Sequence, residues 1–382
     1  MPLAPPDISA ELLRDHVRLA CLPGVGPRMR QLLLERFGSP EGVFAATAAE
    51  LAAIPGIGRK LPNTILGLAT DPVADETLAV CRDRDVAILV EGAAGYPPLL
   101  SRITDPPGVL FTRGSIEPCD SLAVAIVGAR HATTYGRKVA WQLAGSLARA
   151  GYTIVSGLAR GIDAAAHRGA LDAGGRTIAV LGSGVLAVYP PEHADLAREV
   201  VSQGAVIGEA PPLAPPFPGC FPQRNRIVSG LSLGVVVVEA SDRSGALITA
   251  RLAGEQGREV FAVPGPVDSR MSSGCHHLIR DGARLVQGVD DILEELGPLF
   301  ETATTADGRK VQSPAELKLD DVERRVLDGL DELAGGGAGS AADIDELVAA
   351  SGLAASQVLA TIGVLEMRRI VRRLPGSRVA RI

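Results

Sequence analysis

Aromatic side chains are scarce in this sequence: they make up 3% of its 382 residues, although hydrophobic residues as a whole make up 46%. A protein that binds nucleic acid by stacking many bases on rings needs more of them, so the low aromatic content argues against an extended stacking platform. Positive charge is also in deficit, because 38 Lys and Arg face 44 Asp and Glu, which gives a formal net charge of -6. Any polyanion must therefore bind a local cluster of arginines.

The five cysteines lie far apart, and no two of them form a Cys-x-x-Cys pair, which argues against a zinc knuckle. Scattered thiols of this kind are typical of a reducing compartment. The first residues lack a basic segment followed by an apolar core, so no signal peptide is predicted. No uninterrupted apolar run reaches about 18 residues, so no membrane span is expected. These absences predict a cytoplasmic protein.

Residues 1–72 are expected to form a helical domain with an internal echo. LACLPGVGPRMRQLL (19–33) is answered by LAAIPGIGRKLPNTIL (51–66), and in both a helix ends at Pro-Gly-hydrophobic-Gly before another begins. This is the helix-hairpin-helix (SAM-like) pattern, whose glycines allow a tight turn and whose second helix can hold a phosphate on its first N–H groups. Basic residues follow both turns: Arg28, Arg30, Arg59 and Lys60. A hairpin that only packs explains the pattern equally well, so contact with double-stranded DNA through residues 19–66 is left open.

Residues 73–297 alternate between strand-like and helix-like segments. The strand-like runs are apolar and β-branched, as in LAVAIVGAR, RTIAVLGSG and GVVVVEA, and helix-length segments such as TTYGRKVAWQLAGSLARAG separate most of them. Strands that are buried on both faces and joined by helices form a doubly wound, mostly parallel sheet. We therefore predict a Rossmann-like α/β domain that binds its ligand at the carboxyl ends of the strands.

The last part of the chain is predicted to be a linker followed by a winged-helix domain. Residues 298–316 are polar, lack apolar periodicity and end near Ser-Pro, as linkers do. Residues 317–382 contain three helical stretches and then RIVRRL and SRVARI, which Pro375-Gly376 joins. Three helices followed by a β-hairpin are the winged-helix plan.

The first strand turn of the central domain departs from a dinucleotide-binding fingerprint. That fingerprint needs a second glycine so that the backbone can touch a pyrophosphate, but the chain reads Gly128-Ala129-Arg130. The guanidinium of Arg130 suits an external phosphate instead. The next strand ends in Ser156-Gly157 and lacks the acid that a ribose needs, so no nucleotide cofactor is predicted.

A second turn, SGLARG (156–161), brackets Arg160 with glycines at the mouth of a strand. Asp163 and His167 follow it, four residues apart, and therefore share one face of the next helix. An acid–base pair is one interpretation of this spacing. No nucleophile or metal set accompanies the two residues, which favours a structural carboxylate beside an imidazole.

The third segment, FPQRNR (221–226), follows a stiff, proline-rich loop. Arg224 and Arg226 are two residues apart and cannot share a helix face, so we expect different roles for them. One would pair with Glu209 or Glu239 and the other would face the ligand. Either Phe217 of the loop or Phe221 of the segment would stack on a base. The alternative is that both arginines form internal ion pairs and both rings belong to the core.

Two later turns carry small or polar residues. Ser244 and Gly245 open a helix, where they suit either an anion or plain helix capping. The run Cys275-His276-His277 suggests a metal, but three adjacent side chains point in different directions, so no metal is predicted.

Together these segments resemble the DNA processing protein A family (DprA, also called Smf). The resemblance covers about residues 94–297 and rests on Gly-Tyr-Pro at 95–97, the Gly-x-Arg turn, SGLARGIDAAAH, Tyr189-Pro190, FPQRNRIVSGLS, VVEA with SGALITA, and VPGP with LIRDGA. It implies a non-enzymatic homodimer that coats single-stranded DNA entering by natural transformation and loads the RecA recombinase on it. The sequence departs from the family pattern in two places: PPFPGCFP holds no basic residue before FPQRNR, and Cys275-His276-His277 stands where the family reads Gly-x-Asn before Leu-Ile.

The resemblance implies that Arg130 and the loop before Arg224 contact DNA. With the turns above, the predicted DNA-binding set is Gly128, Arg130, Ser156, Gly157, Arg160, Phe221, Arg224, Asn225, Arg226, Ser244, Gly245 and Gly274. The predicted dimer surface lies in residues 276–300, at the margin of the sheet, where few partners are expected for apolar side chains. Its residues are Leu278, Ile279, Leu285, Ile292 and Leu293.

Two other functions fit the same fold. Nucleotide-processing enzymes of the lysine-decarboxylase-like class carry a Pro-Gly-Gly-x-Gly-Thr loop with a catalytic Glu, whereas residues 239–249 here lack the double glycine. A regulator of double-stranded DNA would use the winged helix, whose end is basic, with six arginines and one acid from Glu366 onward. Its first helices are acidic, which argues against a face that reads a groove. Single-strand binding without catalysis is therefore the leading prediction.

Overall fold

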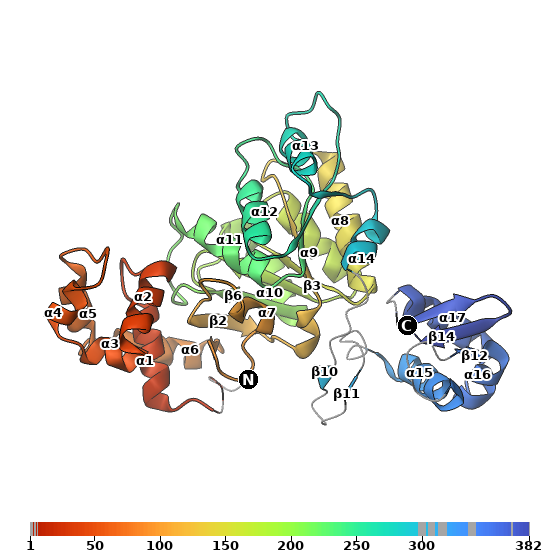
Figure 1. Cartoon of the computed structure of the whole chain (residues 1–382), viewed down its shortest axis with the longest axis horizontal. Coiled ribbons are helices and arrows are strands. Elements are labelled where there is room, and N and C mark those ends of the chain that lie inside the picture. Colours follow the sequence, from red (N-terminus) through yellow and green to blue (C-terminus); the bar gives the residue numbers. More distant parts are fainter. Residues whose placement is uncertain are drawn as a thin grey trace.

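Nine strands form one mostly parallel sheet at the centre of the computed structural model, which describes residues 3, 5, 7–296, 303–304, 310–311, 319–334, 341–367 and 370–381 (Figure 1). The strand order is β1-β2-β6-β5-β4-β3-β7-β8-β9. The strands are β1 Ala87–Val90, β2 Val109–Gly114, β3 Ala123–Val127, β4 Thr153–Ser156, β5 Thr177–Leu181, β6 Gly204–Gly208, β7 Gly234–Val237, β8 Glu259–Ala262 and β9 Arg284–Leu285.

Helices cover both faces of this sheet, because the central strands are apolar on both sides. Val124 and Ile126 of β3 pack on one face, while Ala125 and Val127 pack on the other. The first face is covered by α8 Thr134–Arg149, α9 Ile162–Asp172 and α14 Val289–Leu296, and the second by α11 Cys220–Gly230, α12 Gly245–Glu255 and α13 Ser273–Arg280. The predicted doubly wound Rossmann-like fold is confirmed.

One strand was not predicted. The strand β2 lies between β1 and β6 and pairs with both of them antiparallel, so the sheet begins with an antiparallel pair and continues in parallel from β6 to β9. Short helices fill the connections: α7 Pro98–Ser101, η1 Pro118–Ser121, η2 Pro191–His193 and α10 Ala194–Gln203.

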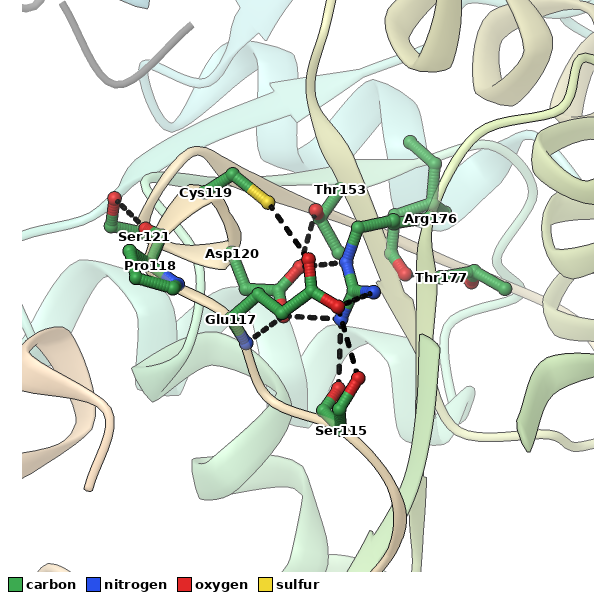
Figure 2. Close-up of polar contacts among 10 residues, drawn as sticks. Ser115, Glu117, Pro118, Cys119, Asp120, Ser121, Thr153, Arg176 and Thr177 are labelled. Carbon is green, nitrogen blue, oxygen red and sulfur yellow. Dashed lines mark hydrogen bonds and ion pairs between the residues drawn. The ribbon is translucent and has the colours of Figure 1, made fainter. Parts of the chain in front are cut away.

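A buried ion pair closes the amino edge of the sheet (Figure 2). Arg176, just before β5, donates from Nε and Nη2 to the carboxylate of Asp120, with both distances at 2.8 Å. The same guanidinium donates to Glu117 at 2.8 Å and to the carbonyl of Ser115 at 2.7 Å. The hydroxyl of Thr153, the first residue of β4, donates to Asp120 at 2.7 Å. This cluster, the Arg176–Asp120 clamp, fastens residues 115–120 to the start of two central strands.

The N-terminal helices reproduce the two hairpins that the sequence predicts. They are α1 Ala10–Ala20, α2 Pro27–Phe37, α3 Pro40–Ala45, α4 Ala48–Ala52, α5 Leu61–Leu68 and α6 Val73–Asp83. Both hairpin turns place a glycine in the left-handed region, with φ of +82° at Gly24 and +80° at Gly56. These positions require glycine, because other side chains are strained there.

The C-terminal helices and strands have the predicted winged-helix arrangement. The helices are α15 Asp321–Ala334, α16 Ile344–Ser351 and α17 Ala355–Met367, and the strands are β12 Ala341–Asp343, β13 Val371–Leu374 and β14 Arg378–Arg381. Strands β13 and β14 form the expected hairpin, and β12 adds a third strand to it. Within the predicted linker, the short strands β10 Ala303–Thr304 and β11 Lys310–Val311 pair with each other; its other residues lie outside the described part.

No single helix among the described residues is long and apolar enough to cross a membrane. The pair α16 and α17 meets the criteria of length and composition only when taken together, and it is bent by 109°. Its apolar residues Leu347, Val358 and Ile362 are buried, as expected in the core of a winged helix.

Candidate nucleic-acid interface

The carboxyl ends of β3, β4 and β7 open into a hollow of about 780 Å³, which we call the carboxyl-edge hollow. Four of the turns that the sequence singles out meet here, since parallel strands bring their following loops to one edge. The predicted residues that line it are Gly128, Arg130, Gly157, Phe221, Arg224, Asn225, Ser244 and Gly245. The hollow therefore brings together most of the predicted DNA-binding set.

Arg130 is the most exposed cation of the predicted set within the hollow. Its guanidinium carbon lies 5.1 Å from the centroid of the Phe221 ring, a cation–π arrangement. The Phe221 ring in turn lies 5.6 Å from the ring of Tyr189. A tight turn holds Arg130 there: a Cβ on Gly128 would lie 2.6 Å from Ile162, so only glycine fits. An exposed guanidinium beside an aromatic face suits a phosphate followed by a base.

Glu239, at the end of β7, has a structural role. Its carboxylate accepts from the backbone N–H of Thr133 at 2.9 Å and also from the Thr133 hydroxyl. Thr133 caps α8, so Glu239 fixes the start of that helix. The side chain is buried, with 5% exposed, and both of its oxygens are engaged. Glu239 is the residue of this sequence nearest to the catalytic Glu of the lysine-decarboxylase-like enzymes, and its carboxylate holds the start of a helix.

Asp163 and His167 share a helix but do not contact each other as an acid–base pair. Asp163 accepts from the N–H groups of Gly157 at 3.1 Å and Ala159 at 3.3 Å and so shapes the second turn. Burial raises the pKa of its carboxyl, although the nearby Arg224 opposes this. His167 bonds through Nδ1 to the Thr177 hydroxyl at 2.7 Å, and burial lowers its pKa to about 3. Both residues support the structure, as the sequence favours.

The prediction that Arg224 and Arg226 differ in role is correct, but both side chains are buried. Arg226 donates to both carboxylate oxygens of Glu209 at 2.8 and 2.9 Å and to Asp105 at 3.1 Å. It is therefore an internal ion pair, and its assignment as a DNA contact is wrong. Arg224 is 6% exposed and donates to the carbonyls of Gly157, at 2.6 Å, and Val180. It forms part of the wall of the hollow, and burial lowers the pKa of its guanidinium.

Three further residues of the predicted DNA-binding set do not line the hollow. Ser156 is fully buried and donates to the carbonyl of Ile126 at 2.6 Å, so its side chain cannot reach a ligand. The backbone N–H of Gly274 donates to Ala240 at 2.9 Å, and a Cβ there would lie 2.8 Å from the Ala240 oxygen; this glycine is needed for packing. Arg160 is exposed, but it pairs with Glu192 and does not line the hollow.

The rim of the hollow contains an exposed cation that sequence reasoning missed. Arg243 is exposed and lies directly before Ser244 and Gly245 at the start of α12. Ser244 accepts from Ala246 N–H at 3.3 Å, as a plain helix cap does. The available signal was a basic residue immediately before a small-residue helix start, which is where an anion binds. Phe217 also lines the hollow and is 53% exposed.

The predicted dimer residues divide into two groups. Ile292 and Leu293 are 0% and 6% exposed and pack into the core under their own sheet, so the prediction is wrong for these two. Leu278 and Ile279 are half-buried, and Leu285 is 42% exposed. Leu285 ends β9, which forms the margin of the sheet as predicted.

The Cys-His-His run does not converge. The Cys275 thiol is buried against the Val237 carbonyl at 3.6 Å, His276 bonds to the Gly265 carbonyl at 3.0 Å, and His277 is exposed 3.6 Å from Asp242. No group of three or more His, Cys, Asp or Glu side chains in the described part of the chain is arranged to hold a metal ion.

The fold and the hollow define a Rossmann-like protein with arginines at a strand edge where a dinucleotide enzyme has glycines. Comparison with family models agrees: residues 87–297 match DNA recombination-mediator protein A, residues 18–66 match a SAM-like helix-hairpin-helix tandem, and residues 310–377 match the DprA winged helix domain. The chain belongs to the DNA recombination-mediator protein A (DprA/Smf) family.

Individual relatives cover the chain to different extents. Protein Smf of Synechocystis is 33% identical over 94% of this chain and 96% of its own length. Protein Smf of Escherichia coli is 50% identical over 53% of this chain and 54% of its own length. The crystal structure of DNA processing protein A from Streptococcus pneumoniae matches with a TM-score of 0.62 and 35% identity, over 73% of this chain and 95% of that one.

Proposed function

We propose that this protein binds single-stranded DNA in the carboxyl-edge hollow, without catalysis, and delivers it to RecA during natural transformation. The observation that carries the proposal is the pairing of exposed cations, Arg130 and Arg243, with the exposed ring of Phe217 and the half-buried ring of Phe221 in one hollow. Guanidinium groups bind phosphates, and rings stack on unpaired bases, so together they fit a single strand.

The acids of the hollow support the same proposal. Asp163 lines it, but its carboxylate accepts two backbone N–H groups, and Glu239 behind it holds Thr133. Engaged carboxylates repel a polyanion less than free ones do, because backbone dipoles offset their charge. A chain with a net charge of -6 can therefore present a locally positive surface at this edge.

The contacts of the acidic and basic side chains near the hollow support binding without catalysis. Three buried groups near the hollow that could act as a base each have a structural partner: Asp163 on the second turn, His167 on Thr177, and Glu239 on Thr133. General acid–base chemistry needs a group within reach of the substrate proton. We expect no turnover of nucleotides or DNA, and release of a free base from AMP that is lost in Glu239→Ala would contradict this.

Double-stranded DNA is the less favoured ligand. A winged helix reads DNA with cations on its recognition helix, but neither α16 nor α17 contains Lys or Arg between Ile344 and Met367. The described cations of this domain lie mostly on the hairpin, as in Arg372 and Arg378. Delivery to RecA and dimerisation are supported by membership of the family and by the exposed Leu285 at the sheet margin.

Binding of matched single- and double-stranded oligonucleotides at several salt concentrations tests the proposal. We expect tighter binding of the single strand, and in Arg130→Ala a uniform loss across sequences with a salt slope lower by about 0.7, the value for one single-strand phosphate contact. Arg251→Ala is the matched control, because Arg251 is an exposed arginine paired within α12 to Glu255, away from the hollow. Equal affinity and slope in the two variants would contradict the proposal, as would preference for the duplex.

A further inference from the structure

A second cavity adjoins the carboxyl-edge hollow. It has a volume of about 500 Å³ and lies between the first helical hairpin and the sheet domain; we call it the interdomain cleft. One wall comes from the end of α1, the turn and the start of α2, and the other from the ends of β5 and β6 and from α11. Figure 1 shows α2 on the side of the helical domain that faces the sheet.

The two cavities meet at shared residues. Phe217 and Arg224 line both of them, so the cleft continues the hollow along the carboxyl edge from β3, β4 and β7 toward β5 and β6. Arg224 is 6% exposed, and its Nε has no hydrogen-bond partner among the described residues. Its two acceptors are backbone carbonyls, not carboxylates. Arg224 therefore stands between the two cavities as a buried cation that has Asp163 near it but keeps one unsatisfied donor, its Nε. An unsatisfied buried N–H group favours an acceptor nearby.

The hairpin wall is built to meet an anion. Gly24, Val25, Gly26 and Pro27 line the cleft, and α2 begins at Pro27 without a side-chain cap. Pro27 has no N–H, so the free N–H groups in the first turn of the 11-residue helix α2 are those of Arg28 and Met29. They carry the positive end of the helix dipole directly after the turn that lines the cleft. The Cβ of any residue placed at Gly26 would find no atom within 4 Å, so the backbone is open there.

The two hairpins, alike in sequence, are placed differently. Arg30 of the first donates to Glu91 at 3.0 Å and to the Pro106 carbonyl at 3.2 Å, which fixes that hairpin against the sheet domain. The matching turn of the second hairpin, residues 55–58, does not line the cleft. The first hairpin is therefore oriented by an ion pair toward the hollow, although the sequence pattern treats the two alike.

We infer that the single strand leaving the carboxyl-edge hollow continues over Phe217 and Arg224 into the interdomain cleft, where the Gly24–Pro27 turn holds a further phosphate. This inference rests on the proposed function. In this arrangement the first helix-hairpin-helix binds the same single strand as the hollow. The helical domain and the sheet domain then form one continuous binding path.

The substitution Gly26→Asp tests the inference. An Asp at this position is a good helix N-cap, so the variant should fold with an unchanged or higher Tm while placing a carboxylate where the phosphate would bind. Binding is measured by fluorescence anisotropy on oligothymidylates of about 6 to about 30 nucleotides. For short strands that fill only the hollow, we expect wild-type affinity. For long strands we expect a loss of roughly fivefold or more and a salt slope lower by about 0.7.

Three further variants distinguish the effect of the added negative charge from the effects of helix capping and of the position of the substitution. Gly58→Asp adds the same charge at the sequence-equivalent position of the second hairpin, where Lys60 rather than Gly58 is the N-cap of α5, and should leave binding unchanged. Gly26→Ser caps α2 without charge and should cost less affinity than Gly26→Asp. Gln223→Glu changes an exposed residue of the opposite wall that lines the cleft and not the hollow, and it should repeat the length-dependent loss.

The outcomes are distinct from failure of the proposed function. If the chain bound no single strand of any length, the proposed function would fail. If wild type bound single strands but Gly26→Asp and Gln223→Glu bound long strands as tightly as wild type, only the path through the cleft would be overturned. Equal losses in Gly26→Asp and Gly58→Asp would overturn it too.

Discussion

At the scale of single residues, burial separates three arginines that have the same side chain: Arg130 is exposed, whereas Arg224 and Arg226 are buried. Arg130 could be identified because it occupies a position that a nucleotide-binding turn reserves for glycine. Arg224 and Arg226 also have guanidinium groups and lie in the same sequence segment as Phe221. Both are nevertheless buried, with 6% and 4% exposed. Their burial depends on acids and carbonyls contributed by distant strands, such as Glu209 after β6. Sequence spacing alone does not contain that information.

His167 predicts a pH dependence of stability. Its imidazole is fully buried, and its pKa falls from 6.5 to about 3 in the folded state. The unfolded chain therefore binds a proton more readily than the folded chain between those two values. Stability is complete above pH 6.5 and decreases as pH falls toward 3, by up to about 1.4 kcal/mol per pH unit for this one group.

The substitution His167→Gln isolates this effect. A Gln amide can still donate to the Thr177 hydroxyl, which the His167 Nδ1 contacts at 2.7 Å, but it does not titrate. We expect a lower free energy of unfolding at pH 7 and a flatter dependence on pH between about 6.5 and about 4. Urea unfolding at a series of pH values measures both. A variant with the same pH slope as wild type would show that His167 is not the responsible group. His16, whose pKa falls to about 4, contributes part of the slope that is left, together with carboxyls of lowered pKa such as that of Asp291.

At the scale of helices and strands, most of the pattern was visible in the sequence. Apolar, β-branched runs predicted the parallel strands, and the repeated Pro-Gly-hydrophobic-Gly pattern predicted the two hairpin turns. The strand β2 was missed, because VLFTRG directly follows Pro-Pro-Gly and ends in Arg-Gly, a context that favours a loop. The strand lies between β1 and β6 and pairs antiparallel with both. A sequence in which helices alternate with strands predicts parallel neighbours, so it does not predict this pairing.

The Arg176–Asp120 clamp gives a prediction at this scale. Asp120 has 4% of its side chain exposed and accepts from Arg176, Thr153 and the backbone of Glu117. In Asp120→Ala the guanidinium of Arg176, which is 16% exposed, keeps Glu117 and the Ser115 carbonyl but loses the buried carboxylate. We therefore expect a loss of about 2–3 kcal/mol, less than the ~3–5 kcal/mol for a buried charge that loses its only partner. The midpoint of urea unfolding should fall accordingly, with the m-value unchanged.

Asp195→Ala is the control for the clamp. Asp195 pairs with Arg198 on the surface of α10, with 79% of its side chain exposed, and exposed pairs contribute about 0–1 kcal/mol. A shift in midpoint no larger than that of the control would mean that the clamp does not stabilise the start of β4 and β5.

At the scale of the whole molecule, the net charge of -6 limits how tightly one copy can hold a polyanion. The carboxyl-edge hollow has two exposed arginines among its lining residues, Arg130 and Arg243, so a single chain offers only a small positive area there. Two copies joined in one dimer would present two such edges to one strand. Linking two sites raises the overall affinity by roughly a hundredfold or more when the geometry allows both to engage.

The margin of the sheet is where we propose that the dimer forms. Leu285 on β9 is 42% exposed, and Leu278 and Ile279 on α13 are half-buried beside it in the chain. Among the described residues, β9 has a strand partner on one side only, and an exposed apolar group at a sheet margin favours association about a two-fold axis. Ile292 and Leu293 are excluded from this surface because they fill the core of their own chain.

Sedimentation of the wild type and of Leu285→Glu at micromolar concentration tests the proposed dimer. We expect a dimer for the wild type and a monomer for Leu285→Glu, with Ile279→Glu as a second variant on the same surface. Leu359→Glu serves as the control, since Leu359 is 45% exposed on α17 of the winged helix and should leave the dimer intact. The monomeric variant should also bind long single strands more weakly while retaining its affinity for short ones, because only the linkage of two sites is lost. A monomeric wild type, or a dimer that survives both Leu285→Glu and Ile279→Glu, would refute this placement.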